Sequence, residues 1–295
     1  MPLIQEVSKR TKPSELKILE ITLWFAFITT AITLPGYAAA QLRVDAASCM
    51  VVNVTTGRVL FYQNIEAPVP PASLTKVLSL YLVYEALERG RIHRWDKVKI
   101  SGRASHTGGT SMFLAPGTEI TLDDLIRGMS IVSANDASVA VAERIGGSVE
   151  RFVEMMNAKA KELNMTDSYF VNPHGLPAKG QVSSSRDMMK LARAYVRRFP
   201  QALAIHSLQS FTYQGITQHN RNRLLGECPG VDGIKTGHVF EAGYNIIVTA
   251  RRQNTRLIAV LLGARTPGIR NREVNRLVEM GFGMVEGKTC DSFGG

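Results

Sequence analysis

Three short groups of residues have the types and the spacing that nucleophilic catalysis by a serine requires. The first is Ser73-x-x-Lys76, which follows Pro70 and Pro71. Apolar residues at three- and four-residue spacing from Leu74 onward predict a helix, so Ser73 lies at its N-terminus and Lys76 one turn on, over the same face. The helix dipole and partial burial both disfavour the lysine cation. Because a neutral lysine is a base, it can activate the serine hydroxyl.

The other two groups are Ser133-Ala134-Asn135 and Lys235-Thr236-Gly237. Ser-x-x-Lys alone is expected about once by chance in a chain of this composition, as a capping serine followed by a surface lysine. Lys-Thr-Gly is expected by chance well under once in a chain of this size. Class A β-lactamases and penicillin-binding proteins carry all three groups in this order, with Asp in the middle of the second. The set therefore indicates acyl transfer through a serine.

The first forty residues have the layout of a secretory signal peptide. Basic side chains precede an uncharged run over 21–34, Pro35-Gly36 breaks this run, and Ala38-Ala39-Ala40 follows. The layout is typical of export, and the uncharged run is shorter than the about 20 residues of a membrane span. We predict that residues 1–40 are cleaved off after Ala40 and that the rest reaches the periplasm or cell-wall space. An uncleaved N-terminal anchor is the alternative.

The charge balance and the cysteines exclude some kinds of partner. The net charge is +10, and residues 1–40 carry four basic and three acidic side chains, so the remainder keeps +9. This charge favours an anionic wall polymer or membrane surface, although general solubility explains it equally well. No basic run interleaves with aromatic residues, so we expect no nucleic-acid partner. Cys49, Cys228 and Cys290 form no metal-ligand spacing, and we expect no metal and no cofactor.

The apolar patterns predict a mixed architecture. Strands are predicted over 46–54, 58–63, 97–100, 231–239, 244–251 and 255–264, and helices over 73–90, 121–131, 136–145, 149–163, 185–199 and 271–284. Residues 101–116, rich in Gly, Ser and Thr, are expected to form a long loop at the rim of a cleft. Thr121 and either Ser184 or Ser185 have the positions of helix N-caps. Cys49, within the first strand, is expected to be buried.

This order predicts an antiparallel sheet built from both ends of the chain, with a helical insert at about 101–200. The fold class is therefore an α/β layer with an all-α subdomain, and a site is expected in the cleft between them. We predict one catalytic domain over 41–286 and a tail over 287–295. The sequence leaves open whether Cys228 and Cys290 form a disulfide.

The chain resembles the low-molecular-mass penicillin-binding proteins of the serine-type D-alanyl-D-alanine carboxypeptidase class over roughly 41–286. Beyond the three groups above, the resemblance rests on four longer segments. They are Met112-Phe113-Leu114-x-Pro116-Gly117, Ser133 to Ser138, Asn172-Pro173-His174-Gly175-Leu176 and Val231 to His238. The resemblance implies the β-lactamase-like transpeptidase fold. It also implies hydrolysis of the terminal D-Ala-D-Ala bond of peptidoglycan stem peptides, with β-lactam antibiotics as covalent inhibitors.

The resemblance also implies roles for individual residues. Ser73 would be the nucleophile and Lys76 its base, while the Ser133 hydroxyl, able to donate and accept at once, would relay a proton to the leaving amine. Asn135 would accept a hydrogen bond from Lys76 and bind the substrate amide.

The remaining residues would bind substrate. Lys235 and Thr236 would hold its C-terminal carboxylate, and Gly237 would allow close approach of the substrate backbone. The backbone N–H groups of Ser73 and His238 would form an oxyanion hole. Arg221 matches a family position associated with the carboxylate, although a surface arginine is equally expected there. His174 and Asp187 are expected to be structural. Since no amphipathic stretch follows the last predicted helix, we do not expect membrane attachment through the C-terminal segment.

Three other functions remain open. A class A β-lactamase requires a glutamate for deacylation, but Ala160 stands where Glu-x-x-Leu-Asn would place that glutamate before Leu163-Asn164. A DD-endopeptidase or transpeptidase acting on peptidoglycan cross-links would use the same serine chemistry. A non-catalytic wall-binding protein would not need a nucleophile, a base and a relay, and all three are present.

Overall fold

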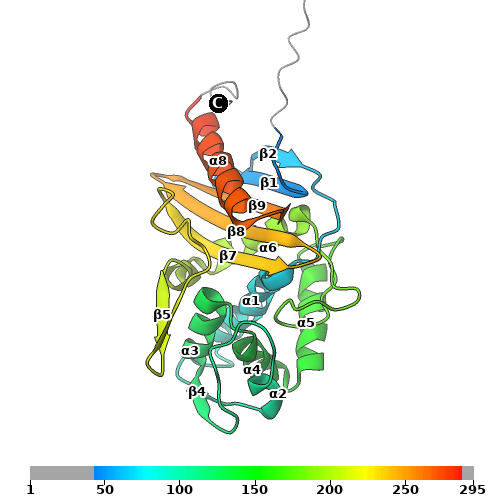
Figure 1. Cartoon of the computed structure of the whole chain (residues 1–295), viewed down its shortest axis with the longest axis vertical. Helices are drawn as coiled ribbons and strands as arrows, with labels where there is room; N and C mark the ends of the chain where they lie inside the picture. The colour runs from blue at the N-terminus through cyan, green and yellow to red at the C-terminus, as the bar shows by residue number, and fades with distance from the viewer. Residues whose placement is uncertain (1–42, 288–295) are drawn as a thin grey trace, which may run out of the picture. The chain divides into compact units, whose positions relative to one another are not determined.

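The main sheet is assembled from both ends of the described chain. The computed structural model describes residues 43–287. The sheet is antiparallel, with the strand order β2-β1-β9-β8-β7. Its strands are β1 (Ser48–Asn53), β2 (Val59–Gln63), β7 (Val231–Val239), β8 (Gly243–Arg252) and β9 (Thr255–Ala264). This order confirms the predicted sheet and leaves β7 at one edge (Figure 1).

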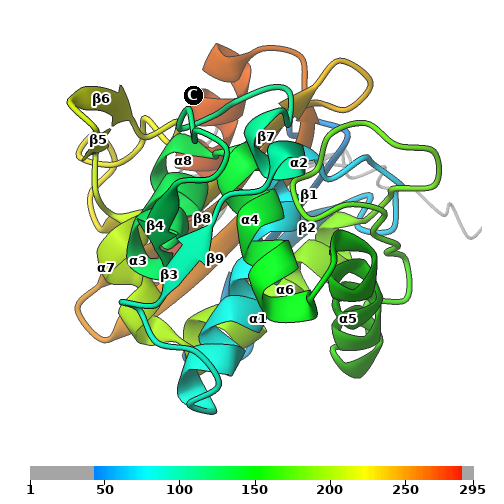
Figure 2. The same cartoon turned by 90° about the horizontal axis from the view of Figure 1, so that it is seen from below.

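Helices cover both faces of the sheet. Residues 245–250 of β8 and 257–262 of β9 are all buried, as expected for strands covered on both sides, which read as continuous apolar runs. The helix α8 (Pro267–Val285) packs on one face through apolar residues such as Leu277. On the other face α6 (Ser185–Arg198) contacts β9 and β1. Figure 2 shows the remaining helices gathered on this second side.

The helical part and two small two-stranded sheets fill the middle of the chain. The helical elements are η1 (Ala72–Leu74), α1 (Thr75–Glu88), α2 (Gly102–Ser105), α3 (Leu122–Arg127), η2 (Gly128–Val132), α4 (Asn135–Gly146), α5 (Val149–Glu162), η3 (Pro200–Ala202) and α7 (Leu203–His206). The small sheets pair β3 (Lys97–Lys99) with β4 (Glu119–Thr121) and β5 (Ser210–Tyr213) with β6 (Ile216–His219), both antiparallel.

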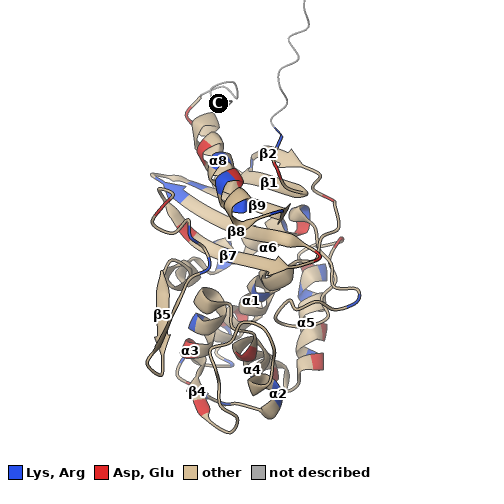
Figure 3. Cartoon of the chain, viewed as in Figure 1, with Lys and Arg blue, Asp and Glu red and all other residues tan. Residues whose placement is uncertain are grey.

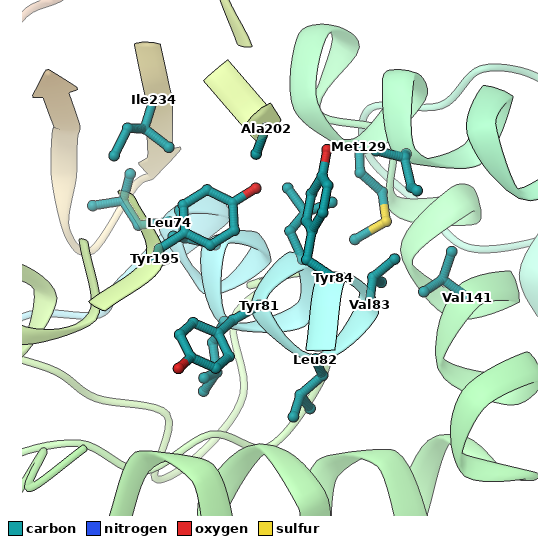
Figure 4. Packing of buried hydrophobic residues seen from close by; sticks show 14 of the residues in the cluster. Leu74, Tyr81, Leu82, Val83, Tyr84, Met129, Val141, Tyr195, Ala202 and Ile234 are labelled. Atoms are coloured by element: carbon teal, nitrogen blue, oxygen red, sulfur yellow. The ribbon is translucent and has the colours of Figure 1, made fainter. Parts of the chain in front are cut away.

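The helix α1 lies at the centre of the core. Its residues 75–86 are all buried, so it is covered on every side. Tyr81 and Tyr84 of α1 meet Phe199, with ring centroids 5.1 and 5.6 Å apart, and Tyr195 packs on Tyr84 at 5.9 Å. Figure 4 shows these tyrosines between α1 and its neighbours, with Leu74 and Ile234 close by. Dense packing fixes α1 in place, which is what a catalytic group at its N-terminus requires.

Most predicted elements are confirmed, and the exceptions are local. Thr121 and Ser184 cap α3 and α6, each accepting a hydrogen bond from a backbone N–H three residues on. The prediction that 101–116 is entirely loop is wrong at 102–105, where Ser101 caps the short helix α2. The strands β4, β5 and β6 and the helix α7 were not predicted. The last helix begins at Pro267 rather than at 271, because Thr266 caps it and proline suits a first helical turn.

Several predictions lie outside the described residues. The signal peptide over 1–40, the tail beyond 287 and Cys290 belong to the segments that the structure does not describe, and the domain bounds 41–286 stay a prediction. Cys49 is buried as expected, and Cys228 is buried and free. Between residues 43 and 287, no helix has the combined length and apolarity that crossing a bilayer demands.

Candidate active site

The amine of Lys76 is surrounded by three oxygen atoms. Its Nζ lies 3.1 Å from Ser73 Oγ, 2.7 Å from Asn135 Oδ1 and 2.6 Å from the backbone oxygen of His174. The Lys76 side chain is fully buried. Burial, followed by the positive charge of Lys235, holds the pKa of Lys76 well below its usual value, and the charge of Asp136 opposes this shift. Lys76 therefore loses its proton, and becomes a neutral amine, at a pH closer to neutrality than an exposed lysine does.

The two shorter contacts decide how a neutral Lys76 is oriented. A neutral amine has two N–H donors and one lone pair, whereas Asn135 Oδ1 and the His174 carbonyl oxygen can only accept. The Asn135 amide is held in this orientation because its Nδ2 donates to Gly108 O at 2.8 Å. When both N–H groups are engaged in this way, the lone pair remains for the Ser73 hydroxyl. The same geometry that satisfies the buried amine therefore aims its basic electron pair at the serine.

Ser133 stands between two helical segments in a left-handed conformation. Its φ and ψ are 72° and 30°, and the π-helical turn η2 ends on it while α4 starts at Asn135. A residue other than glycine in this region costs about 1–3 kcal/mol and persists where its surroundings impose it. Here Gly128 O accepts from the N–H of both Ser133 and Ala134. Ser133 lines the same cleft as Ser73.

The edge strand β7 forms the opposite wall. Lys235 is buried, with its Nζ donating to Thr236 O at 3.1 Å, and burial, reinforced by the charges of Arg221 and Arg270, lowers its pKa to about 7. A Cβ at Gly237 would lie only 3.0 Å from the backbone nitrogen of Ser73. Glycine here therefore allows β7 to approach the serine closely.

The cleft between these walls is cationic. It has a volume of about 750 Å³, and the nine residues predicted for the site either line it or lie buried beside it. Arg221, Arg223 and Arg270 line it, whereas no acidic side chain among the described residues does. Figure 3 shows basic residues on the segment leading into β7 and on α8. Such a wall favours an anionic group of a ligand.

Arg270 is a cleft residue that the sequence did not reveal. It lies in the first turn of α8, is buried, and has a pKa lowered to about 10, mainly by burial. The prediction began this helix at 271, which left Arg270 in a loop. The capping Thr266 before Pro267 was the available signal, because a cap followed by proline marks a helix start.

The turn 172–176 contributes more than the structural role expected for it. The carbonyl of His174 accepts from Lys76, while its ring Nδ1 accepts from the N–H of Leu176. Burial, helped by the charge of Lys76, lowers the pKa of His174 to about 3, so the imidazole is neutral. At Gly175, with φ of 91°, a Cβ would lie 1.9 Å from Ala72 O. Only glycine allows this turn to reach Lys76.

Comparison with known proteins agrees with this geometry. A family profile described as D-alanyl-D-alanine carboxypeptidase matches residues 36–266. The chain belongs to the D-alanyl-D-alanine carboxypeptidase family. It is 39% identical to D-alanyl-D-alanine carboxypeptidase DacF of Bacillus subtilis over 262 residues, which are 85% of this chain and 66% of that relative. It spans about two thirds of the length of the curated relatives it matches.

Solved structures of similar proteins have the same fold. Penicillin binding protein 6B of Escherichia coli has a TM-score of 0.79 and 38% identity, over 84% of this chain and 80% of that one. A penicillin-binding protein of Listeria monocytogenes, solved with ampicillin bound, has a TM-score of 0.75 and 32% identity, over 82% of this chain and 98% of that one. This member of the carboxypeptidase family thus has the penicillin-binding-protein fold predicted from its sequence.

In this carboxypeptidase family member, Asp136 ties the cleft rim to α4. Its carboxylate is fully buried and accepts from Ser111 Oγ at 2.6 Å and from the backbone N–H groups of Met112 and Leu114 at 3.1 Å. The next residue back, Asn135, donates its backbone N–H to Thr110 O at 2.7 Å. The rim and the residue that orients Lys76 are therefore held by one short segment.

We expect Asp136→Asn to lower the free energy of unfolding by about 2–3 kcal/mol, because its amide would face N–H donors that are then left unsatisfied. Residues 108–116 should also become more sensitive to proteolysis. Thermal unfolding and timed digestion measure both effects, with exposed Glu119→Gln as the control. Wild-type stability and an unchanged digestion pattern in Asp136→Asn would contradict the anchoring role.

Proposed function

We propose that the chain is a serine-type D-Ala-D-Ala carboxypeptidase that removes the terminal D-alanine from peptidoglycan stem peptides. The observation that carries this proposal is the buried Lys76 amine, hydrogen-bonded to Ser73 Oγ and to two acceptors that fix its orientation. The family match and the cationic cleft support the same reaction, and the proposal therefore also includes the substrate class, peptidoglycan stem peptides.

In the acylation step, Ser73 Oγ attacks the carbonyl carbon between the two D-alanines and gives its proton to Lys76 Nζ. The negative oxygen of the tetrahedral intermediate accepts from the backbone N–H groups of Ser73 and His238. When the C–N bond breaks, Ser133 passes the proton from Lys76 to the leaving amine. Water then attacks the ester on Ser73, with Lys76 again as base, and releases the shortened peptide.

The terminal carboxylate is the group that the cleft recognises. Lys235, the Thr236 hydroxyl and the arginines at 221 and 270 surround the side of the cleft toward which the leaving D-alanine points. Charge-assisted hydrogen bonds to a carboxylate are roughly twice as strong as neutral ones. A peptide that ends in a free carboxylate is therefore preferred. A β-lactam carries a carboxylate near its reactive carbonyl and would acylate Ser73 covalently.

Rapid hydrolysis of penicillin is not expected. No Asp or Glu of the described chain lines the cleft, and Ala160, at the position of the missing glutamate, is buried in α5. Among the described residues, no carboxylate that could act as a second base therefore lies near the ester. We propose export through a cleaved signal peptide, because the substrate lies outside the cytoplasm, and the net charge of +10 suits an anionic wall or membrane surface.

A donor assay tests the proposal against its alternatives. We expect the purified protein to release free D-alanine from a pentapeptide ending in D-Ala-D-Ala, and to cleave a cross-linked dimer at least about tenfold more slowly, since the pentapeptide ends in the small carboxylate that the cationic wall fits. Chromatography of the products measures both. Cross-link cleavage without D-alanine release would favour an endopeptidase, and binding to wall polymer without any turnover would favour a scaffold.

A further inference from the structure

Within the described chain, two hydrogen bonds join α1 to the turn that contains His174. Lys76 Nζ donates to the carbonyl of His174 at 2.6 Å, and Ser79 Oγ donates to the carbonyl of Pro173 at 2.7 Å. Lys76 and Ser79 lie three positions apart and therefore share one face of α1. Two neighbouring carbonyl groups of the turn are thus held by two donors that lie one helical turn apart.

Ser79 directs its hydroxyl away from its own helix. The side chain is fully buried in the middle of α1. A serine inside a helix commonly donates to the carbonyl four residues earlier, whereas Ser79 donates to Pro173. A second acceptor near its hydroxyl is the Met156 sulfur, at 3.8 Å, and a thioether accepts only weakly. The strong hydrogen bond of Ser79 is therefore the one to the turn.

The turn is shaped by its own side chains. Asn172 Oδ1 accepts from the N–H of Gly175 at 2.7 Å, and Asn172 Nδ2 donates to Leu176 O at 2.9 Å. These bonds keep the turn compact, but they do not fix where it lies against α1. The close packing at Gly175 limits how near the turn can approach, and the bond from Ser79 holds it there.

Lys76 is poorly suited to hold the turn by itself, because its protonation changes during the proposed reaction. The ammonium form has three N–H donors, whereas the neutral amine has two and must keep its lone pair directed at Ser73. The Ser79 hydroxyl stays neutral and donates the same hydrogen bond in both states. While it holds the carbonyl of Pro173, the next carbonyl, that of His174, stays in place as an acceptor for Lys76.

We propose that Ser79 is a positioning residue, which fixes the His174 carbonyl and thereby the direction of the Lys76 lone pair. This proposal rests on the proposed function and adds to it a buried residue that does not line the cleft. In Ser79→Ala the carbonyl of Pro173 would lose its donor, and the turn could shift. A displacement of about 1 Å in an orienting group can cost about 10²-fold in rate.

Acylation by penicillin tests this role. In Ser79→Ala we expect the acylation rate constant to fall about 10- to 100-fold, while the Kd of the noncovalent penicillin complex keeps its wild-type value. Ser79→Cys, whose thiol occupies the same place but donates weakly, should lie between Ser79→Ala and the wild type. Stopped-flow measurements over a range of penicillin concentrations separate the two constants, and thermal unfolding shows that each variant is folded.

Ser48→Ala is the matched control. The Ser48 hydroxyl is also fully buried, and it is hydrogen-bonded to Ser185 Oγ of α6; neither residue lines the cleft. Ser48→Ala should therefore be acylated at the wild-type rate. Slowing in Ser48→Ala equal to that in Ser79→Ala would show that loss of any buried hydroxyl has this effect, and it would overturn the positioning role.

A double-mutant cycle with Lys76→Ala separates positioning from a general loosening of the fold. Because Ser79 acts through Lys76, Ser79→Ala should cause no further slowing of the residual acylation in Lys76→Ala. An equal fold-loss in both backgrounds, or wild-type acylation in Ser79→Ala, would overturn the role of Ser79 alone. A wild-type protein that penicillin does not acylate would overturn the proposed function itself.

Discussion

Ser73→Ala is expected to abolish covalent labelling by a fluorescent penicillin and to reduce D-alanine release by a factor on the order of 10⁴ or more. The reason is that, of the three oxygen atoms that contact the Lys76 amine in the described structure, Ser73 Oγ alone is a hydroxyl that can form an ester; the other two belong to an amide side chain and a backbone carbonyl. Labelling is measured as fluorescence of the protein on a denaturing gel, which detects only covalent adducts.

The serine control separates chemistry from folding. Ser207→Ala removes an exposed hydroxyl that donates to Ala204 O within its own turn, and it should label like the wild type. Circular dichroism should give Ser73→Ala a melting temperature close to that of the wild type. Labelling retained in a folded Ser73→Ala protein would show that another residue is the nucleophile.

Lys76→Ala is expected to slow acylation by penicillin about 10³-fold, within the range for loss of a general base. Ser73 would keep its position but would have no group to accept its proton. Lys76→Arg should be equally slow, since a guanidinium stays charged at every accessible pH and has no lone pair to offer. Stopped-flow quenching of protein fluorescence gives the acylation rate. A Lys76→Arg protein with near wild-type rates would contradict a neutral base.

The pH profile of the wild type supplies a second readout of the same prediction. In the proposed mechanism, acylation requires neutral Lys76 and cationic Lys235. The rate should therefore rise as Lys76 loses its proton, at a pH well below that of an ordinary lysine. It should fall as Lys235 loses its proton near pH 7. In Lys235→Arg the fall of the acylation rate on the alkaline side should shift to higher pH, because arginine remains charged.

The parts of the site that depend on local sequence were the predictable ones. Periodicity after Leu74 located α1, and with it the spacing of Ser73 and Lys76, because a helical face is a property of neighbouring residues. The caps Thr121 and Ser184 were predictable for the same reason. The β-rich runs near the C-terminus gave β7 to β9 almost to the residue.

The parts that depend on distant contacts were not predictable. The His174 carbonyl meets Lys76 across 98 positions of the chain, and no local pattern reports such a contact. Ser133 has a left-handed conformation after a π-helical turn. In the sequence, this turn has the same apolar pattern as the end of an ordinary α-helix. Arg270 was hidden by a helix boundary set four residues late, and boundaries are the least reliable feature of pattern analysis. Each case concerns how elements meet rather than which elements form.

The central claim is that Ser73 becomes acylated because the neutral Lys76 amine beside it accepts its proton. The most direct measurement is mass spectrometry of the protein incubated with penicillin, followed by peptide mapping of the adduct. The mass should rise by one penicillin, with the added group on Ser73, and Lys76→Arg should show almost none in the same time. An adduct on any other residue, or full acylation of Lys76→Arg, would contradict the claim.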